Sequence, residues 1–404
     1  MGIPDASALR TARTLLRHHP LVDGHNDLPW ALRKRFGADL DRVDLATPVA
    51  GTHTDIPRLR RGGVGAQFWS VYVPGALQGD AAVATTLEQI DLVHRMIRAH
   101  PDDLELALGA EDVEAAFARG RVASLLGAEG GHSIANSLGV LRALHGLGVR
   151  YLTLTHNVNV PWADAATDVP AVGGLSAFGR EVVYEMHRLG MLVDLSHVAA
   201  STASDVLGVA EAPVLFSHSG ARAVCDHPRN VPDDLLRRLA TNGGVCMVTF
   251  VPDFVSPRCR AWALGLRAEV ERRGLDPRDA GVRAAVGAEY AAERPRPRAS
   301  LAEVADHVEH VRAVAGIDHV GLGGDYDGSD DVPDGLEDVA CYPALVAELL
   351  GRGWSEDECV RLVGGNVLRV LRVAEAVSHS STARRGPSTA RIEDLDRLPA
   401  RLGT

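Results

Sequence analysis

The sequence of 404 residues predicts an α/β fold of the (β/α)8 TIM-barrel class. Eight short apolar segments alternate along the chain with amphipathic segments of helical periodicity. The apolar segments are rich in Val and Leu with little polar alternation, which is typical of parallel strands buried on both faces. Eight strands alternating with helices favour a closed barrel. A doubly wound sheet is the alternative, but no glycine motif for dinucleotide binding supports it.

The expected strands are LVDGH from residue 21, GAQFWSVYV from 65, VASLLGAEG from 122, VRYLTLTH from 149, MLVDLSH from 191, PVLFSHS from 213, GVCMVTF from 244 and HVGLGGDYD from 319. Between them, segments such as 85–99 and 300–316 place apolar residues at helical spacing. Three helices are expected to begin with a capping box, in which a Ser or Thr and a Glu three residues later satisfy the first backbone N–H groups. The pairs are Thr85 with Glu88, Ser300 with Glu303, and Ser355 with Glu358.

We expect one metallohydrolase domain over residues 1–375. Residues 251–299 read as helical pieces inserted after the seventh strand. On a barrel, such an insertion either covers the active face or decorates the periphery, and the sequence favours neither. Residues 376–404 are rich in Ser, Thr and Arg, so we expect a flexible, loosely packed C-terminal tail.

Charge and cysteine content limit the partners and the compartment. The net charge of -11 argues against nucleic acid, whose phosphates need a basic face. The five cysteines form no CxxC pair, which indicates a reducing compartment. The first twenty residues lack the apolar stretch of a secretory signal, and no apolar run reaches the length of a membrane span. We therefore expect a cytoplasmic protein with no membrane partner.

The near absence of lysine excludes several kinds of enzyme. Only Lys34 is a lysine among 42 basic residues, and it lies in the polar stretch ALRKRFG. The chain thus has no phosphate-binding GK[ST] loop, no SxxK acylase motif and no candidate Schiff-base lysine.

Six of the eight expected strands end in a residue that can bind a metal or move a proton. They are His25 with Asp27, then Glu129, His156, His197, His218 and Asp325. In a barrel these ends converge on one face, and alternate strand residues share a side. A single buried His is more often a hydrogen-bonded core residue than a ligand. So many imidazoles and carboxylates would be costly to bury together unpaired, and a cation removes that cost.

Imidazole and carboxylate ligands without a thiolate cluster indicate zinc, with manganese or cobalt as alternatives. The number of ligands exceeds what one four-coordinate ion uses, which favours two ions. Since no lysine ends a strand, Glu129 is the candidate bridging ligand. Weaker patterns are interpreted as structural. His53 and Asp55 are read as loop residues, and Cys225 as a structural thiol. His132, His187, His227, His307, His310 and His319 are read as helix-face or loop residues.

The motifs VDGHNDLPW, GAQFWSVYVP, EGGHSI, YLTLTHNVNVPWADAA, VDLSHV, FSHSGARAVCDHPRNVPDD, GGDYDG and GGNVLRVL together resemble the membrane (renal) dipeptidase family of binuclear zinc dipeptidases. The resemblance runs from about residue 12 to 373, and its motifs are long and in order. It implies a (β/α)8 barrel, two Zn2+ per chain, dipeptide substrates and a homodimer. We expect the chain to differ from the mammalian members by lacking the secretory signal and the lipid anchor, and by carrying residues 251–299. It is also expected to lack their disulfides, although Cys225 and Cys259 leave one pair open.

The resemblance also implies a role for each site residue. His25 and Asp27 bind the first zinc with Asp325 nearby, Glu129 bridges, His197 and His218 bind the second zinc, His156 contacts the substrate carbonyl, and Arg229 binds the substrate carboxylate. The expected reaction is hydrolysis of a dipeptide by a metal-bridged hydroxide, with Asp325 moving the proton and a D-residue tolerated at the C-terminal position. The alternatives are another barrel amidohydrolase, a lactonase or a deaminase, and a barrel that binds without catalysis.

Overall fold

The computed structural model describes residues 5–277 and 279–396, and nine parallel strands form one sheet within them. The strands are β1 (Leu21–Asn26), β2 (Val64–Ser70), β3 (Leu104–Leu106), β4 (Val122–Glu129), β5 (Val149–Thr153), β6 (Leu192–Asp194), β7 (Leu215–Ser219), β8 (Val245–Val248) and β9 (Val320–Leu322). The pairing order is β2-β1-β9-β8-β7-β6-β5-β4, and β4 pairs again with β2. That last pairing closes an eight-stranded barrel, so the predicted fold class is confirmed.

The ninth strand, β3, was not expected. It pairs with β4 alone and stands outside the closed ring. Leu104 is buried and the other two residues are partly buried, and three residues are too few to form the apolar run that marks the barrel strands. The pairing of Leu104 with Val122 holds β3 in place. Because this strand depends on its partner, its three residues alone do not predict it.

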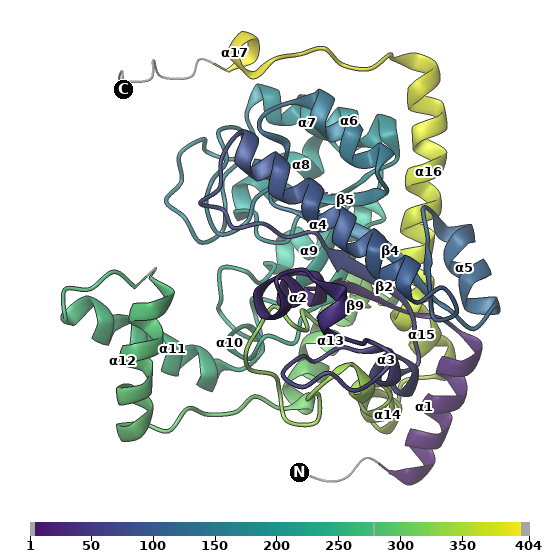
Figure 1. The fold of residues 1–404 in the computed structure, drawn as a ribbon, viewed down its shortest axis with the longest axis vertical. Helices are drawn as coiled ribbons and strands as arrows, with labels where there is room; N and C mark the ends of the chain where they lie inside the picture. The colour runs from purple at the N-terminus through teal and green to yellow at the C-terminus, as the bar shows by residue number, and fades with distance from the viewer. Residues whose placement is uncertain (1–4, 278, 397–404) are drawn as a thin grey trace.

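Helices surround the barrel (Figure 1). Those outside the insertion are α1 (Ala6–His18), α2 (Leu28–Phe36), α3 (Ile56–Gly62), α4 (Asp80–Ala99), α5 (Ala110–Ala118), α6 (Leu138–Gly146), α7 (Ala177–Leu189), α8 (Ala200–Val209), α9 (Asp233–Asn242), α13 (Leu301–Ala315), α14 (Tyr342–Gly351), α15 (Glu356–Val360), α16 (Asn366–Arg384) and α17 (Ile392–Leu395). A π-helical turn, Arg361–Gly365, joins α15 to α16. Among the described residues, no helix is both long and apolar enough to cross a membrane.

Two of the three predicted capping boxes are present. Ser300 and Ser355 each accept from the backbone N–H three residues on, and Glu303 and Glu358 complete the motif. The prediction for Thr85 is wrong. The helix α4 already begins at residue 80, and the Thr85 hydroxyl donates to the carbonyl of Ala81 inside the helix.

A close approach between two strands shapes the barrel interior beneath the site. Gly127 of β4 and Tyr151 of β5 are register partners. A Cβ atom at Gly127 would lie only 2.0 Å from the ring of Tyr151. The glycine therefore leaves room for a fully buried tyrosine ring to cross the barrel toward β1.

The insertion follows β8, which is the seventh strand of the barrel. It contains α10 (Pro252–Val255), α11 (Pro257–Arg272) and α12 (Ala280–Glu293). Figure 1 shows α11 and α12 standing apart from the barrel, joined to it through α10. The two longer helices contact each other through the rings of Trp262 and Tyr290, whose centroids lie 5.4 Å apart.

The C-terminal segment is more ordered than we expected. Residues 376–384 continue α16, and α17 follows at residue 392. Asp396 accepts hydrogen bonds from the Ser176 hydroxyl and from the backbone N–H of Phe178, and Ile392 is buried. These contacts hold the segment against α7, which composition alone does not reveal. Residues 397–404 of the predicted tail lie outside the described residues.

Candidate metal centre

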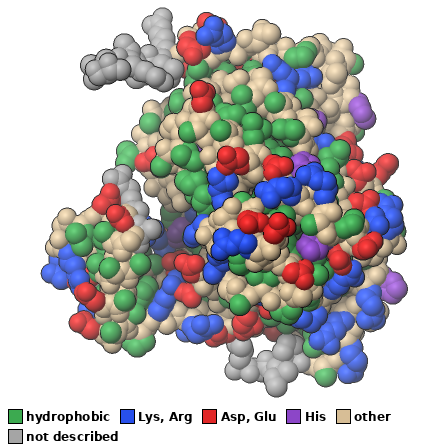
Figure 2. Space-filling view, in the orientation of Figure 1, with side chains coloured by type: hydrophobic (Ala, Val, Ile, Leu, Met, Phe, Trp, Pro, Cys, Tyr) green, Lys and Arg blue, Asp and Glu red, His purple; other side chains and the backbone are tan. Residues whose placement is uncertain are grey.

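A cavity of about 710 Å³ opens at the C-terminal ends of the barrel strands. It is lined by Asp27, Glu129, His156, His197, Arg229 and Asp325, among others. The two remaining predicted ligands, His25 and His218, lie buried at its floor. The structure thus brings all eight predicted site residues to one place. Figure 2 shows the hollow between the insertion and the main body, with histidine atoms in its depth.

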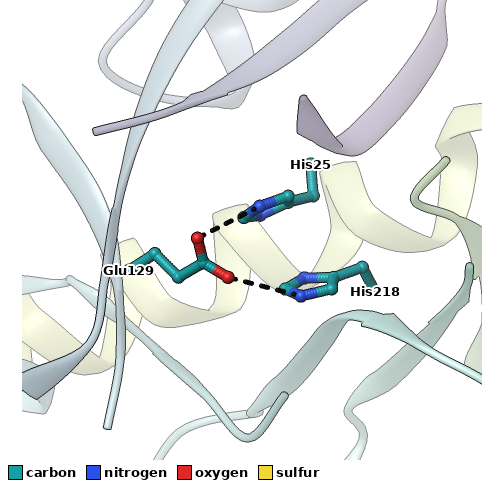
Figure 3. A group of neighbouring side chains, drawn as sticks. All are labelled: His25, Glu129 and His218. Atoms are coloured by element: carbon teal, nitrogen blue, oxygen red, sulfur yellow. Dashed lines mark ion pairs between the residues drawn. The ribbon is translucent and has the colours of Figure 1, made fainter. Parts of the chain in front are cut away.

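The two carboxylate oxygens of Glu129 point toward different imidazoles, one toward His25 and the other toward His218 (Figure 3). Its Oε2 atom is 3.6 Å from Nε2 of His25. Its Oε1 atom is 3.0 Å from Nε2 of His197 and 3.5 Å from Nε2 of His218. One oxygen therefore faces His25 and the other faces His197 and His218, as a bridging carboxylate requires. We call His25, Asp27 and Asp325 the first donor group, and His197 and His218 the second.

Each group contains further donors at short range. In the first group, His25 Nε2 lies 3.4 Å from Oδ2 of Asp27 and 3.9 Å from Oδ1 of Asp325. In the second, the Nε2 atoms of His197 and His218 are 3.0 Å apart. Ligand atoms this close to one another could share a metal ion. His156 is next to the second group, with Nε2 3.8 Å from Oε1 of Glu129.

The hydrogen bond at the far side of the His25 ring assigns its tautomer. Nδ1 of His25 lies 2.8 Å from the hydroxyl of Tyr151, which itself donates to the carbonyl of Gly24. The hydroxyl proton is thus used, so Nδ1 carries the hydrogen and Nε2 points its lone pair at three carboxylates. A cation at Nε2 removes this repulsion, and Nε2 has no hydrogen-bond partner among the described residues.

His218 is oriented in the same way. Its Nδ1 lies 2.8 Å from the hydroxyl of Ser217, which donates to Oδ2 of the buried Asp194. The Nε2 lone pair of His218 therefore faces the site. Burial holds the pKa of His218 well below its usual range, so the ring is neutral. A metal-binding imidazole usually donates its other ring N–H to a hydrogen-bond acceptor that fixes its orientation, and the hydroxyl groups of Tyr151 and Ser217 are such acceptors for His25 and His218.

The donor set fits a metal centre of the zinc type. It consists of imidazole nitrogens and carboxylate oxygens, and no cysteine belongs to any candidate group of metal ligands among the described residues. His197 Nδ1 and Asp27 Oδ1 are also buried without a protein partner. Because unpaired buried polar atoms are costly, their concentration here favours bound ions.

Two of the candidate ligands have left-handed backbone conformations. His197 has a φ of 70° and Asp325 a φ of 58°, although neither is a glycine. Such conformations are uncommon outside glycine and concentrate at functional sites. The space in front of Asp325 is equally restricted, because a Cβ atom at Gly328 would lie 2.3 Å from Oδ2 of Asp27 and 2.4 Å from Oδ1 of Asp325.

The carboxylates of the site have opposite pKa shifts. Burial raises the pKa of Asp325 well above its usual range. The negative charges of Asp27 and Glu129 raise it further, whereas His25 acts to lower it. Burial also opposes ionisation of Glu129, but His25 and His156 bring its pKa well below the usual range.

Arg229 lies at the wall of the same cavity. The residue is 4 % exposed, and no carboxylate of the described chain forms an ion pair with it. Its guanidinium donates only two long hydrogen bonds, of 3.3 and 3.4 Å, to the carbonyl of His218. Burial lowers the pKa of Arg229 to about 10, which still leaves it charged at neutral pH. A buried cation facing a cavity is a natural partner for an anionic group of a ligand.

Sequence reasoning missed the residues that orient the ligands. Tyr151 and Asp194 lie within expected strands, but a tyrosine in a strand is ordinary. Asp194 offered a signal, because a carboxylate in the middle of the apolar run MLVDLSH needs a partner. The insertion also contributes to the site, since Val251, Phe254 and Arg283 line the cavity.

The weaker candidates have structural roles. Asp55 caps α3 and binds Arg58, as expected of a loop residue. His53 exchanges hydrogen bonds with Asp327, whose backbone N–H donates to His53 Nδ1. Cys225 and Cys259 are both free thiols, and burial raises the pKa of Cys225 to about 11.

Comparison with known proteins gives one family. The family model described as membrane dipeptidase (peptidase family M19) matches residues 9–385. Dipeptidase 3 of Homo sapiens is 43 % identical over 389 residues, covering 95 % of this chain and 71 % of the human protein. Dipeptidase 3 of Mus musculus is 44 % identical over 375 residues, covering 92 % and 67 %.

Solved structures support the same fold. The crystal structure of a probable dipeptidase from Pseudomonas aeruginosa superposes with a TM-score of 0.77 at 23 % identity, covering 92 % of this chain and all of the other. A metallo peptidase from Rhodobacter sphaeroides, liganded with a phosphinate mimic of the dipeptide L-Ala-D-Ala, gives 0.73 at 24 % identity, covering 88 % of this chain and 99 % of that one.

Proposed function

Because the chain belongs to the membrane dipeptidase family, we propose that it is a dipeptidase that uses two Zn2+ to hydrolyse the peptide bond of free dipeptides. One observation carries the proposal. The buried, unpaired guanidinium of Arg229 faces the same cavity as the two donor groups that share Glu129. A charged anchor beside a hydrolytic centre selects a substrate with a free carboxylate close to the scissile bond.

His25, Asp27 and Asp325 would hold one ion, His197 and His218 the other, and Glu129 both. Bound there, the ions would polarise the scissile carbonyl and make a water molecule acidic enough to attack near neutral pH.

The chain's own groups would complete the reaction. Asp325 would accept the proton of the attacking water and deliver it to the leaving amine. His156, beside the second donor group, would donate a hydrogen bond to the carbonyl oxygen as negative charge develops there. Arg229 would hold the terminal carboxylate with its planar fork.

We also propose that the enzyme accepts a D-residue at the C-terminal position. Arg229 would bind the carboxylate and the ions would bind the carbonyl, so the side chain of the C-terminal residue between them need not be bound tightly. The Rhodobacter sphaeroides peptidase with its L-Ala-D-Ala mimic is consistent with this proposal.

The test is hydrolysis by zinc-loaded protein of L-Ala-L-Ala, L-Ala-D-Ala and L-Ala-L-Ala amide, next to a panel of lactones and nucleosides. We expect both free dipeptides to be cleaved and the amide to be a poor substrate. Turnover of a lactone or a nucleoside without any dipeptide would assign the site to another amidohydrolase. The expected homodimer and cytoplasmic location stay predictions, which light scattering and cell fractionation would test.

A further inference from the structure

We propose that Phe254, at the start of the insertion, is a positioning residue that holds Arg229 ready for the substrate carboxylate. This inference deepens the proposed function and rests on it. If Phe254 positions Arg229, the insertion contributes to substrate selection as well as lining the cavity. Phe254 lies in α10, whereas Arg229 lies in the loop that follows β7.

The first observation is the contact between the two side chains. The guanidinium carbon of Arg229 lies over the ring of Phe254, 5.2 Å from its centroid. An aromatic face attracts a cation, and the attraction grows as water is excluded. Arg229 is almost fully buried, so its contact with Phe254 is a desolvated one.

The second observation is how little else holds the guanidinium. Its Nε atom has no partner among the described residues, and both terminal nitrogens share one distant carbonyl. A flexible side chain with such weak hydrogen bonds would lose considerable rotamer entropy when it binds a carboxylate. The ring of Phe254 restricts it beforehand while leaving its hydrogen-bond donors available to the ligand.

The third observation is that the surroundings of Phe254 are built to stay in place. His227 stacks on the ring with centroids 4.2 Å apart, and its Nδ1 accepts from the backbone N–H of Arg229. Burial, with the nearby charges of Arg260 and Arg229, lowers the pKa of His227 to about 3. The imidazole is therefore neutral and adds no repulsion to the guanidinium.

Hydrogen bonds fasten α10 to the loop that carries Arg229. The side-chain amide of Asn230 donates to the carbonyls of Phe254, at 2.7 Å, and of Cys225, at 2.8 Å. The buried His307 of α13 joins the same two segments, since Nε2 contacts the carbonyl of Val255 and Nδ1 accepts from the N–H of Ala221. These hydrogen bonds thus fix the position of Phe254 relative to Arg229, which lies 25 residues earlier in the sequence.

The test compares Phe254→Leu, which removes the aromatic face, with Phe254→Tyr, which keeps it. We expect KM for L-Ala-L-Ala to rise roughly two- to thirtyfold in Phe254→Leu, with kcat little changed. Turnover of the dipeptide amide should not change, and Phe254→Tyr should restore most of the loss. Phe178→Leu, in the core against Trp162, is the matched control for losing one buried ring.

A binding measurement keeps the inference separate from the proposed function. Calorimetry in the zinc-loaded Asp325→Asn background, where turnover should be about 10² to 10⁴ times slower, reports affinity for L-Ala-L-Ala and its amide. We expect the preference for the acid over the amide to shrink in Phe254→Leu by the same factor as KM rises. The inference is overturned if Phe254→Leu weakens acid and amide equally, as it would if the ring only contacts the substrate, or if neither changes. A wild-type protein that binds the acid selectively but cleaves no dipeptide would refute the proposed function instead.

Discussion

The hydroxyl of Tyr151 lies 2.8 Å from Nδ1 of His25, on the side of the imidazole away from Asp27 and Glu129. The tyrosine ring reaches this position because its register partner on β4 is Gly127. The hydroxyl fixes the orientation of the ring, and thereby the direction in which Nε2 points.

Tyr151→Phe should weaken metal binding while the fold is retained. Loss of a hydrogen bond behind a metal-binding His costs typically 10- to 100-fold in affinity. Competition with a chromogenic zinc chelator would measure the change. Tyr184→Phe, whose ring contacts Arg385 at the surface, is the control. Equal zinc affinity in Tyr151→Phe and wild type would show that barrel packing alone orients His25.

Glu129→Gln should lower the zinc content from two ions to one and remove most activity. The substitution keeps the shape but removes the charge between two cations, so their mutual repulsion is less compensated. Metal analysis of dialysed protein checks the stoichiometry, with Glu356→Gln in the exposed first turn of α15 as the control. Two retained ions would mean that the bridge is provided elsewhere.

Asp325→Asn should reduce kcat by a factor of about 10² to 10⁴, the usual contribution of general acid–base catalysis. The amide cannot take a proton from water and return it to the leaving amine. Zinc content must be measured in the same samples, since Asp325 also belongs to the first donor group. A variant with both ions and near-normal kcat would remove Asp325 from proton transfer.

Arg229→Met should reduce kcat/KM for free dipeptides about ten- to hundredfold, because charge-assisted hydrogen bonds contribute roughly 1.5–3 kcal/mol. The dipeptide amide, already a poor substrate of the wild type, should lose little more. The two changes should therefore be strongly non-additive, as expected of partners in one contact. Equal damage to acid and amide would assign Arg229 to the support of the metal centre.

His307 should make stability depend on pH between about 6.5 and 4. Burial lowers its pKa from 6.5 to about 4 in the folded protein. Across that interval the unfolded chain binds a proton that the native protein does not, so the stability that His307 contributes is present above pH 6.5 and falls with pH. The loss approaches about 3 kcal/mol at pH 4.

Denaturant unfolding of wild type and His307→Gln at several pH values would measure this effect, because contributions common to both proteins cancel in the difference. The free-energy gap between them should shrink as the pH falls. His379→Gln, at the exposed end of α16, controls for removing one imidazole. A gap that does not vary with pH would contradict the assignment.

Sequence reasoning reached the barrel and the residues at its C-terminal face because both depend on local patterns. An apolar run that ends in His25 or Glu129 marks a buried strand and its end, and parallel strands in a barrel converge at those ends. The same local reasoning failed for one strand and for the start of one helix. β3 exists through its pairing with β4, and the start of α4 left Thr85 inside the helix rather than at its cap.

The sequence by itself therefore determined which side chains meet, and the tertiary structure decided how they face one another. One oxygen of Glu129 faces His25 and the other faces His197 only because the β2–β4 pairing closes the sheet. Tyr151 supports His25 from across the barrel, and Phe254 meets Arg229 because Asn230 ties their segments together. Contacts of this kind join residues that are far apart in the chain, so they arise from packing geometry and leave no periodic or local signal to read.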